Sequence, residues 1–290
     1  MSGNLGTGGE VFDFSSMGRF TNPLDLIDDP KVDAVDICLP TNFHAPVAMA
    51  ALQAGKHVLV EKPIALSTAE ADEMLTTAKQ TGRTLMAAHV LRFLAPYRGL
   101  TSALHSGEYG RVRSAVFRRR CAAPTWSKWL TDTDRSGGAI LDLLIHDIDY
   151  VLHVFGETRI TFATGYENLA NGIDLLHANL ITKEDVDIVI TGGWHHPKAY
   201  PFSMEYTIVT DRATFDFNSA AAGESGVAIY TSEGEKQSLE LPTEDGFIAE
   251  LAYFHECCVN GKQPEFCPPE ESAAAVKLAL DLAIARQEPG

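Results

Sequence analysis

The sequence predicts an α/β domain followed by an α+β domain: an abbreviated Rossmann-like parallel sheet, then an open, mostly antiparallel sheet. Strand-like and helix-like segments alternate up to about residue 100, and strand-like segments dominate after it. The length of 290 residues, at roughly 150 residues per domain, also suits two domains. We therefore expect one domain at residues 1–100 and the other, for substrate and oligomerisation, at residues 101–290.

The first half contains the alternating pattern. Residues 21–30 predict a short helix, and residues 32–40 (VDAVDICLP) an apolar strand ended by a proline. A helix over residues 44–56 precedes a strand at residues 57–63 (HVLVEKP). Residues 67–82 predict a helix that begins at Ser67 and ends at Gly82, before a strand at residues 84–90. This alternation is typical of a parallel sheet with right-handed crossovers.

The second half reads as strands joined by turns. One long helix is predicted over residues 138–155, and two late helices over residues 246–259 and 271–286. The strand-like segments are residues 112–121, 159–167, 173–181, 186–194, 202–211 and 213–217. A short strand at Val11 to Phe14, or a second chain, is expected to pair with the otherwise open edge of the strand at residues 32–40.

Composition excludes several classes of protein. A net charge of −16 makes the chain a poor partner for nucleic acid. No apolar run approaches the roughly 18 residues of a membrane span, and no secretory signal is visible at the start. Five cysteines without a C-x-x-C pair suit reduced thiols. We therefore expect a cytoplasmic protein that binds neither nucleic acid nor membrane.

Polar residues follow two strands of the predicted parallel sheet. Open parallel sheets bind ligands at the carboxyl ends of their strands, which here carry residues 39–42 and Glu61-Lys62-Pro63. A lysine at such a strand end can be a fixed hydrogen-bond donor in a cleft. From spacing alone, a solvated surface lysine is the more common alternative.

The long helix of the second half carries the other candidate residues. Asp142 and His146 are four positions apart, so they share a helix face and can meet. A carboxylate beside an imidazole fixes the tautomer of the ring and forms an acid/base unit. An ordinary polar pair on a helix surface is the alternative. Asp149 lies on another face and could line a cleft.

Taken together, the segments VDAVDICLPTNFHAPVAMAALQAGKHVLVEKP, AAHVLRF and GGAILDLLIHDIDYVLHVFG resemble the Gfo/Idh/MocA oxidoreductases, which use NAD or NADP on sugars and related polyols. The resemblance implies that Lys62 holds the substrate hydroxyl, His146 takes its proton and Asp142 orients the site. It also implies dimers or tetramers. The residues that it places near the cofactor or substrate are Pro40, Asn42 and His44 at the ribose and phosphates, Glu61 at the nicotinamide ribose, and Arg92 at the substrate or nicotinamide edge.

The start of the sequence departs from the family pattern. No G-x-G-x-x-G turn between a strand and a helix is present, and Gly6-Thr7-Gly8-Gly9 lacks that context. An alternative is therefore a hydrolase, lyase or isomerase of a sugar-like substrate that uses the same three residues without a nicotinamide. A non-catalytic family remnant is a further alternative. No metal site is predicted, although His195 and His196 could join Asp142 and His146 around a divalent ion.

An aromatic loop precedes the long helix. Trp126 and Trp129 stand on either side of Lys128, and aromatic faces often stack on sugar rings. We expect Trp126 to contact the substrate, with core or interface packing as the alternative.

Overall fold

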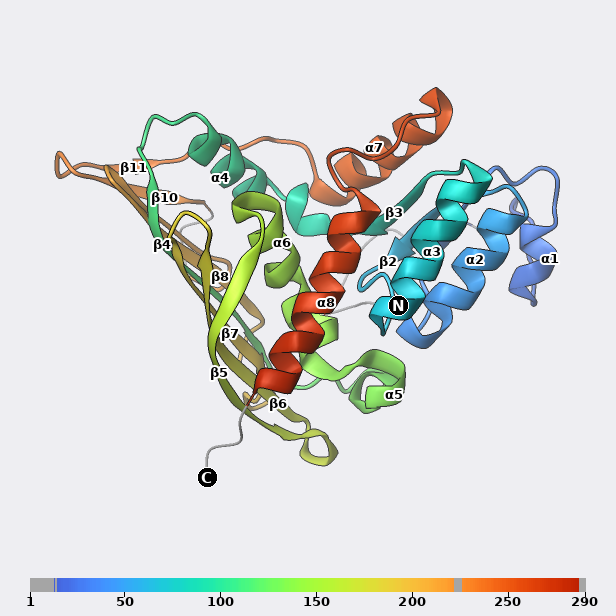
Figure 1. Ribbon diagram of the computed structural model, residues 1–290, viewed down its shortest axis with the longest axis horizontal. Helices are drawn as coiled ribbons and strands as arrows, with labels where there is room; N and C mark the ends of the chain where they lie inside the picture. The colour runs from blue at the N-terminus through green and yellow to red at the C-terminus, as the bar shows by residue number, and fades with distance from the viewer. Residues whose placement is uncertain (1–12, 14, 222–225, 287–290) are drawn as a thin grey trace.

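The computed structural model describes Asp13, residues 15–221 and residues 226–286. Two sheets lie side by side and share several helices (Figure 1). The parallel sheet holds three strands in the order β1-β2-β3, and the larger sheet holds eight. This arrangement confirms the predicted fold class.

The three-stranded sheet is built from the predicted alternating segments. Its strands are β1 (Ala34–Ile37), β2 (His57–Glu61) and β3 (Leu85–Ala88), and all pair in parallel. The helices before and between them are α1 (Pro23–Ile27), α2 (His44–Gln53) and α3 (Thr68–Thr81). Helix α3 begins with the predicted cap, because Ser67 and Glu70 bond each other's backbone N–H groups. The helix ends at Gly82 in the left-handed conformation.

The eight-stranded sheet has the order β11-β10-β9-β8-β4-β7-β6-β5. Every neighbouring pair is antiparallel except β4 and β7, which run parallel. The strands are β4 (Val112–Cys121), β5 (Thr158–Asn168), β6 (Ile173–Thr182), β7 (Asp187–Trp194), β8 (Ser203–Thr210), β9 (Ala213–Asn218), β10 (Ala228–Thr231) and β11 (Lys236–Ser238). The sequence pattern did not predict β10 and β11.

Helices cover one side of the large sheet and reach the small one (Figure 1). The helices that follow β3 are α4 (Ala95–His105), α5 (Thr133–Ser136), α6 (Ile145–Phe155), α7 (Gly246–Asn260) and α8 (Pro269–Ala285), of which α7 packs on the small sheet. Helix α8 packs against α6, α3 and both sheets, so a single hydrophobic core extends through both. A second apolar cluster lies between α7 and the three-stranded sheet.

The predicted pairing of Val11 to Phe14 falls outside the described residues, apart from Asp13, and β1 has β2 as its only strand partner among those described. Within the described part of the chain, no helix is both long and apolar enough to span a bilayer.

Candidate active site

The candidate site lies where the strands of the small sheet end. The 3₁₀ turn Thr41–Phe43 follows β1, Lys62 follows β2, and His89 follows β3. Because Glu61 pairs with Ala88, Lys62 and His89 leave neighbouring strands at the same level. Parallel strands thus place groups from three loops at one sheet edge, as the sequence predicts.

Lys62 reaches across to the helix that carries the other candidates. Its Nζ atom donates to the carbonyl oxygen of Asp142 at 2.6 Å and to Asp142 Oδ1 at 3.1 Å. Asp142 lies in a π-helical turn, Ile140–Leu144, that leads into α6. Such turns widen a helix and are frequent at functional sites. Both side chains stay about one-fifth exposed, so small molecules can approach the pair.

His146 lies one turn further along the same helix. Its ring is partly buried, and its Nδ1 atom is buried without a hydrogen-bond partner among the described residues. Burial lowers the pKa of His146 well below its usual value, and the charges of Lys62 and Arg119 lower it further. The ring is therefore neutral near pH 7 and has a lone pair that can accept a proton.

The predicted pairing of Asp142 with His146 is wrong in one respect. The carboxylate accepts from Lys62, and the structure has no hydrogen bond between Asp142 and His146. The lysine is a stronger partner because the charge-assisted bond joins two ionised groups, whereas His146 is neutral. Asp142 thus orients the ammonium group of Lys62 and does not fix the tautomer of His146.

Arg92, which the resemblance places at the substrate or nicotinamide edge, and Asp149, expected to line a cleft, bind each other. The guanidinium donates to both oxygens of Asp149, from Nε at 2.9 Å and from Nη2 at 2.6 Å. Both side chains are 0% exposed. Although burial works to raise the pKa of Asp149, its interactions with His89 and Arg92 hold it below its usual value. The pair is a buried structural ion pair because these groups satisfy each other.

Three residues in or next to the turn after β1 are those that the resemblance places near the cofactor. Pro40 precedes the turn and has an extended backbone conformation. Asn42 Oδ1 is buried without a hydrogen-bond partner among the described residues. His44 is buried, with Nδ1 2.8 Å from the carbonyl oxygen of Pro63 and Nε2 2.9 Å from that of Leu39. The ring therefore joins two loops, and its contacts leave no nitrogen for a phosphate. Of the three residues, Asn42 retains a free acceptor.

Carboxyl groups gather beside this turn. Glu61 is partly buried, and burial raises its pKa. Glu250, on α7, is 4% exposed, and its Oε1 has no hydrogen-bond partner in the described chain. Burial, with the nearby charges of Glu61 and Asp36, raises the pKa of Glu250 to about 8. Glu250 is thus mostly a neutral acid at pH 7.

Sequence reasoning missed His89 and Glu250. His89 is 1% exposed, and its Nδ1 lies 3.5 Å from Asp149 Oδ2. Burial lowers its pKa to about 4, so the ring is neutral. Its position directly after a predicted strand was the available signal. For Glu250 the signal was helical spacing, because Gly246, Glu250 and Phe254 share one buried face.

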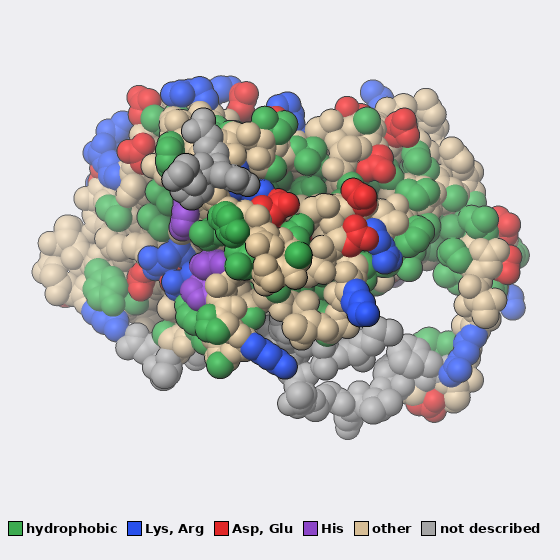
Figure 2. Space-filling view, turned by 90° about the horizontal axis from the view of Figure 1, so that it is seen from below, with side chains coloured by type: hydrophobic (Ala, Val, Ile, Leu, Met, Phe, Trp, Pro, Cys, Tyr) green, Lys and Arg blue, Asp and Glu red, His purple; other side chains and the backbone are tan. Residues whose placement is uncertain are grey.

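The remaining candidates lie on the large sheet and its loops. Trp126 is 58% exposed, in a loop that leads to α5, and α5 contacts the turn after β1. The rings of His195 and His196 are 4.1 Å apart, and His196 stacks on Tyr200. No group of three or more metal-ligating residues occurs within the described ranges. Figure 2 shows histidine side chains beside Lys and Arg side chains on one face of the molecule.

The basic run in β4 divides between the two faces of the sheet. Arg118 and Arg120 both pair with Glu205, and Arg119 points the other way to Asp147 on α6. Strand alternation predicts this division, and each of the three arginines pairs with one of two carboxylates.

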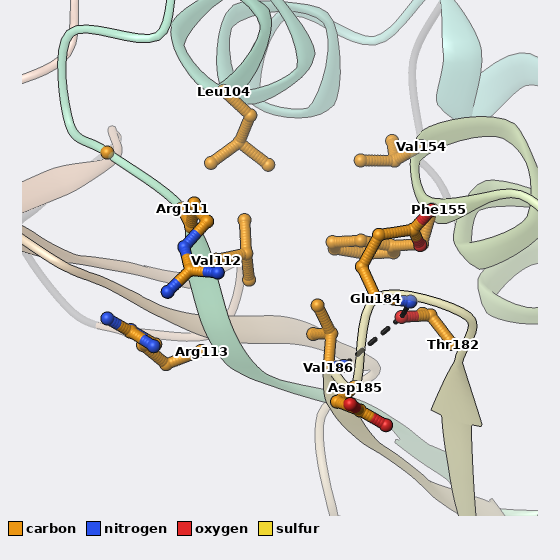
Figure 3. A pocket seen from close by; sticks show the side chains of 11 residues that line it. Leu104, Arg111, Val112, Arg113, Val154, Phe155, Thr182, Glu184, Asp185 and Val186 are labelled. Atoms are coloured by element: carbon orange, nitrogen blue, oxygen red, sulfur yellow. Dashed lines mark hydrogen bonds between the residues drawn. The ribbon is translucent and has the colours of Figure 1, made fainter.

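A cavity of about 860 Å³ lies away from these residues, at the far end of α6 (Figure 3). Val154 and Phe155 of α6, Arg111 and Arg113 of the β4 region, and the turn between β6 and β7 form its walls. None of the predicted site residues lines it, so it is separate from the candidate site.

Comparison with protein families gives two matches. A model described as an oxidoreductase family with an NAD-binding Rossmann fold, GFO_IDH_MocA, matches residues 9–89. The GFO/IDH/MocA C-terminal domain matches residues 97–216.

Individual relatives agree with these matches. Myo-inositol 2-dehydrogenase of Thermotoga maritima is 34% identical over 283 residues, which cover 93% of this chain and 80% of the relative. The 1,5-anhydro-D-fructose reductase of Ensifer adhaerens is 29% identical over 259 residues, or 84% of this chain and 74% of the relative. Among solved structures, the 3-ketoreductase KijD10 of Actinomadura kijaniata, in complex with NADP and TDP-benzene, superposes with a TM-score of 0.80. It is 22% identical, and the match covers 91% of this chain and 81% of that structure.

Proposed function

This chain belongs to the Gfo/Idh/MocA oxidoreductase family, and we propose that it oxidises a sugar or polyol hydroxyl, or reduces the corresponding ketone, with NAD or NADP. The contact of Lys62 with Asp142, one turn from the neutral ring of His146, carries the proposal. It places a cationic donor beside a proton acceptor, as oxidation of an alcohol requires.

Each residue has a distinct part in the proposed reaction. Lys62 donates a hydrogen bond to the substrate oxygen and stabilises the negative charge that develops there. His146 accepts the hydroxyl proton, because burial and two neighbouring cations keep its ring neutral. Asp142 holds the ammonium group of Lys62 in place through two acceptors, its carboxylate and its carbonyl. Bound nicotinamide would supply the hydride acceptor.

The residues at the strand ends suit a nicotinamide nucleotide in part. Asn42 Oδ1 is a buried acceptor without a partner among the described residues, and ribose hydroxyls are donors that would satisfy it. Glu61, partly buried at the end of β2, offers a second acceptor. The glycines Gly6, Gly8 and Gly9 fall outside the described residues.

We further propose that the chain forms homo-oligomers through the uncovered side of the large sheet. The described helices lie on its other side (Figure 1), and the exposed aromatic residues Phe162, Tyr166 and Tyr230 stand on its strands. Apolar side chains on a broad sheet face are typical of interfaces. Light scattering of the purified protein should give a dimer or tetramer, and a monomer at micromolar concentration would contradict this.

Calorimetric titration with NAD, NADH, NADP and NADPH tests the cofactor, and absorbance at 340 nm with inositols, glucosides and anhydro-sugars tests the reaction. We expect micromolar binding of one nucleotide pair. Lys62→Met and His146→Asn should each lower turnover by about 100-fold or more and leave nucleotide binding intact. A folded protein that binds no nucleotide would refute the proposal, and cleavage of a glycoside without a nucleotide would favour the hydrolase or lyase alternative.

A further inference from the structure

Three ion pairs hold the helical segment that carries the site residues. Each acid faces a cation from a different part of the chain. The pairs are Asp142 with Lys62, Asp147 with Arg119, and Asp149 with Arg92. Arg119 comes from β4, within the large sheet, whereas Lys62 and Arg92 follow β2 and β3 of the small sheet. Two of the three pairs therefore connect the helix to the small sheet.

Arg92 has the most extensive set of partners. Its Nε and Nη2 atoms donate to the two oxygens of Asp149, as described above. Its Nη1 atom lies 2.6 Å from Glu271 Oε2, 3.1 Å from the carbonyl oxygen of Phe266 and 3.1 Å from His153 Nδ1. These partners lie on α6, on α8 and in the segment before α8. One side chain thus links the end of β3 to two helices.

We propose that Arg92 is a positioning residue that sets the register of α6 against the small sheet, and thereby sets Asp142 against Lys62. Lys62 and Arg92 follow adjacent strands and contact the same helical segment at Asp142 and Asp149. A planar guanidinium bonded to both carboxylate oxygens fixes rotation as well as distance. The single ammonium of Lys62 does not fix rotation, so of the two contacts with the small sheet the one from Arg92 determines it.

Two observations favour this role over a ligand contact or simple stabilisation. The Arg92 side chain is 0% exposed, and every one of its nitrogens has a partner. A buried ion pair often adds little net stability over apolar packing, because desolvation offsets the attraction. Its clearest physical effect is therefore the orientation of the elements that it joins.

The test compares Arg92→Lys with Arg119→Lys in the full-length protein. Arg119 is the matched control, because it also makes a buried two-oxygen contact with an aspartate of α6, but from the large sheet. Hydrogen exchange measured by mass spectrometry reports on residues 61–65 and 139–146. In Arg92→Lys we expect exchange in both segments to rise by about 10-fold or more. In Arg119→Lys residues 61–65 should keep their protection.

Kinetics provide a second readout, which rests on the proposed function. Misplacement of a catalytic group by about 1 Å can lower a rate by about 100-fold. Arg92→Lys should lower kcat by about that factor and leave nucleotide affinity unchanged. If the wild-type protein has no dehydrogenase activity, the proposed function fails, and the exchange comparison still decides the role of Arg92.

Several results would overturn the role. These are equal exchange changes in both variants, unchanged exchange in Arg92→Lys, or a selective loss of nucleotide or substrate affinity in Arg92→Lys. Should Arg92→Lys not fold, Glu271→Gln is the second variant. It removes the charge of the α8 carboxylate that Arg92 contacts, and the Glu271 side chain is 42% exposed. That variant should change exchange in the same two segments, to a smaller extent, and no change there would also overturn the role.

Discussion

Replacing Glu250 by glutamine should stabilise the protein, and the gain should grow as the pH rises. The carboxyl is buried on α7, with one oxygen unpartnered in the described chain, beside the charges of Glu61 and Asp36. Deprotonation of Glu250 therefore adds a buried negative charge close to two other carboxylates. Glutamine has nearly the same shape and no proton to lose, so the substitution removes the charge with little change in packing.

The magnitude follows from the two pKa values of Glu250. The native environment raises the pKa from 4.5 to about 8, so between these values the folded protein holds a proton that the unfolded chain has lost. The stability that this proton provides is complete below 4.5 and is lost as the pH rises toward 8. At about 1.4 kcal/mol per pKa unit, Glu250 lowers the free energy of unfolding by about 1 kcal/mol at pH 5 and about 4 kcal/mol at pH 8.

Urea denaturation of wild type and Glu250→Gln at pH 5, 6, 7 and 8 measures this difference. The variant should gain about 3 kcal/mol more at pH 8 than at pH 5. Glu256→Gln is the control, because Glu256 is exposed on the same helix. An equal effect of Glu250→Gln at both pH values, or a less stable variant at pH 8, would refute the assignment of Glu250 as a buried neutral acid.

Four further outcomes are expected. Because the pKa of His146 is well below 6.5, kcat/KM for alcohol oxidation should stay constant as the pH falls from 8 through 6.5, and a profile with its midpoint at 6.5 or above would contradict this. Asp147→Asn leaves the buried charge of Arg119 uncompensated and should lower the free energy of unfolding by about 3 kcal/mol in urea titrations. Gly192→Ala would place a Cβ 1.9 Å from the Arg119 carbonyl oxygen at φ +148, so thermal unfolding should show a loss of at least about 2 kcal/mol, and an unchanged Tm would disprove the close approach. Ser67→Ala removes the cap of α3 and should lower the free energy of unfolding by about 1 kcal/mol in urea titrations. An unchanged free energy would show that the cap does not form in solution.

Local patterns were enough to predict the small sheet and the ends of its strands. Hydrophobic periodicity and capping residues act over a few positions, so they can be read directly, as at Ser67 and Gly82. The same patterns predicted that Lys62 follows a strand and that Asp142 and His146 share a helix. The resemblance, not the spacing, brought these three residues together.

The partners of buried charges could not be predicted in this way. Asp142 binds Lys62, which is 80 positions away, and Arg92 binds Asp149, which is 57 positions away. These choices depend on how α6 packs between the sheets and on the π-helical turn that widens its start. Such turns have no simple sequence signature, so the orientation of Asp142 toward Lys62 was beyond local reasoning.

Helix α4 was missed for an identifiable reason. Its sequence contains Pro96 and Gly99, which normally indicate a turn. Pro96 lies in the first turn of the helix, where its missing N–H is tolerated. At Gly99 a Cβ would lie 2.8 Å from Leu241 Cδ2, so a larger residue here would displace that side chain. The contact is with a distant segment and has no local sequence signal.

The packing of α7 on the small sheet has a consequence for synthesis of the chain. Leu59 and Met86 of that sheet are covered by Phe254 and Cys267, and the Cys267 thiol contacts the carbonyl oxygen of Ala87, 180 positions earlier. At 5–20 residues per second, a ribosome needs roughly 10 to 40 s to add that many residues. During this interval the nascent sheet exposes one apolar face, a surface on which chaperones act and at which aggregation starts.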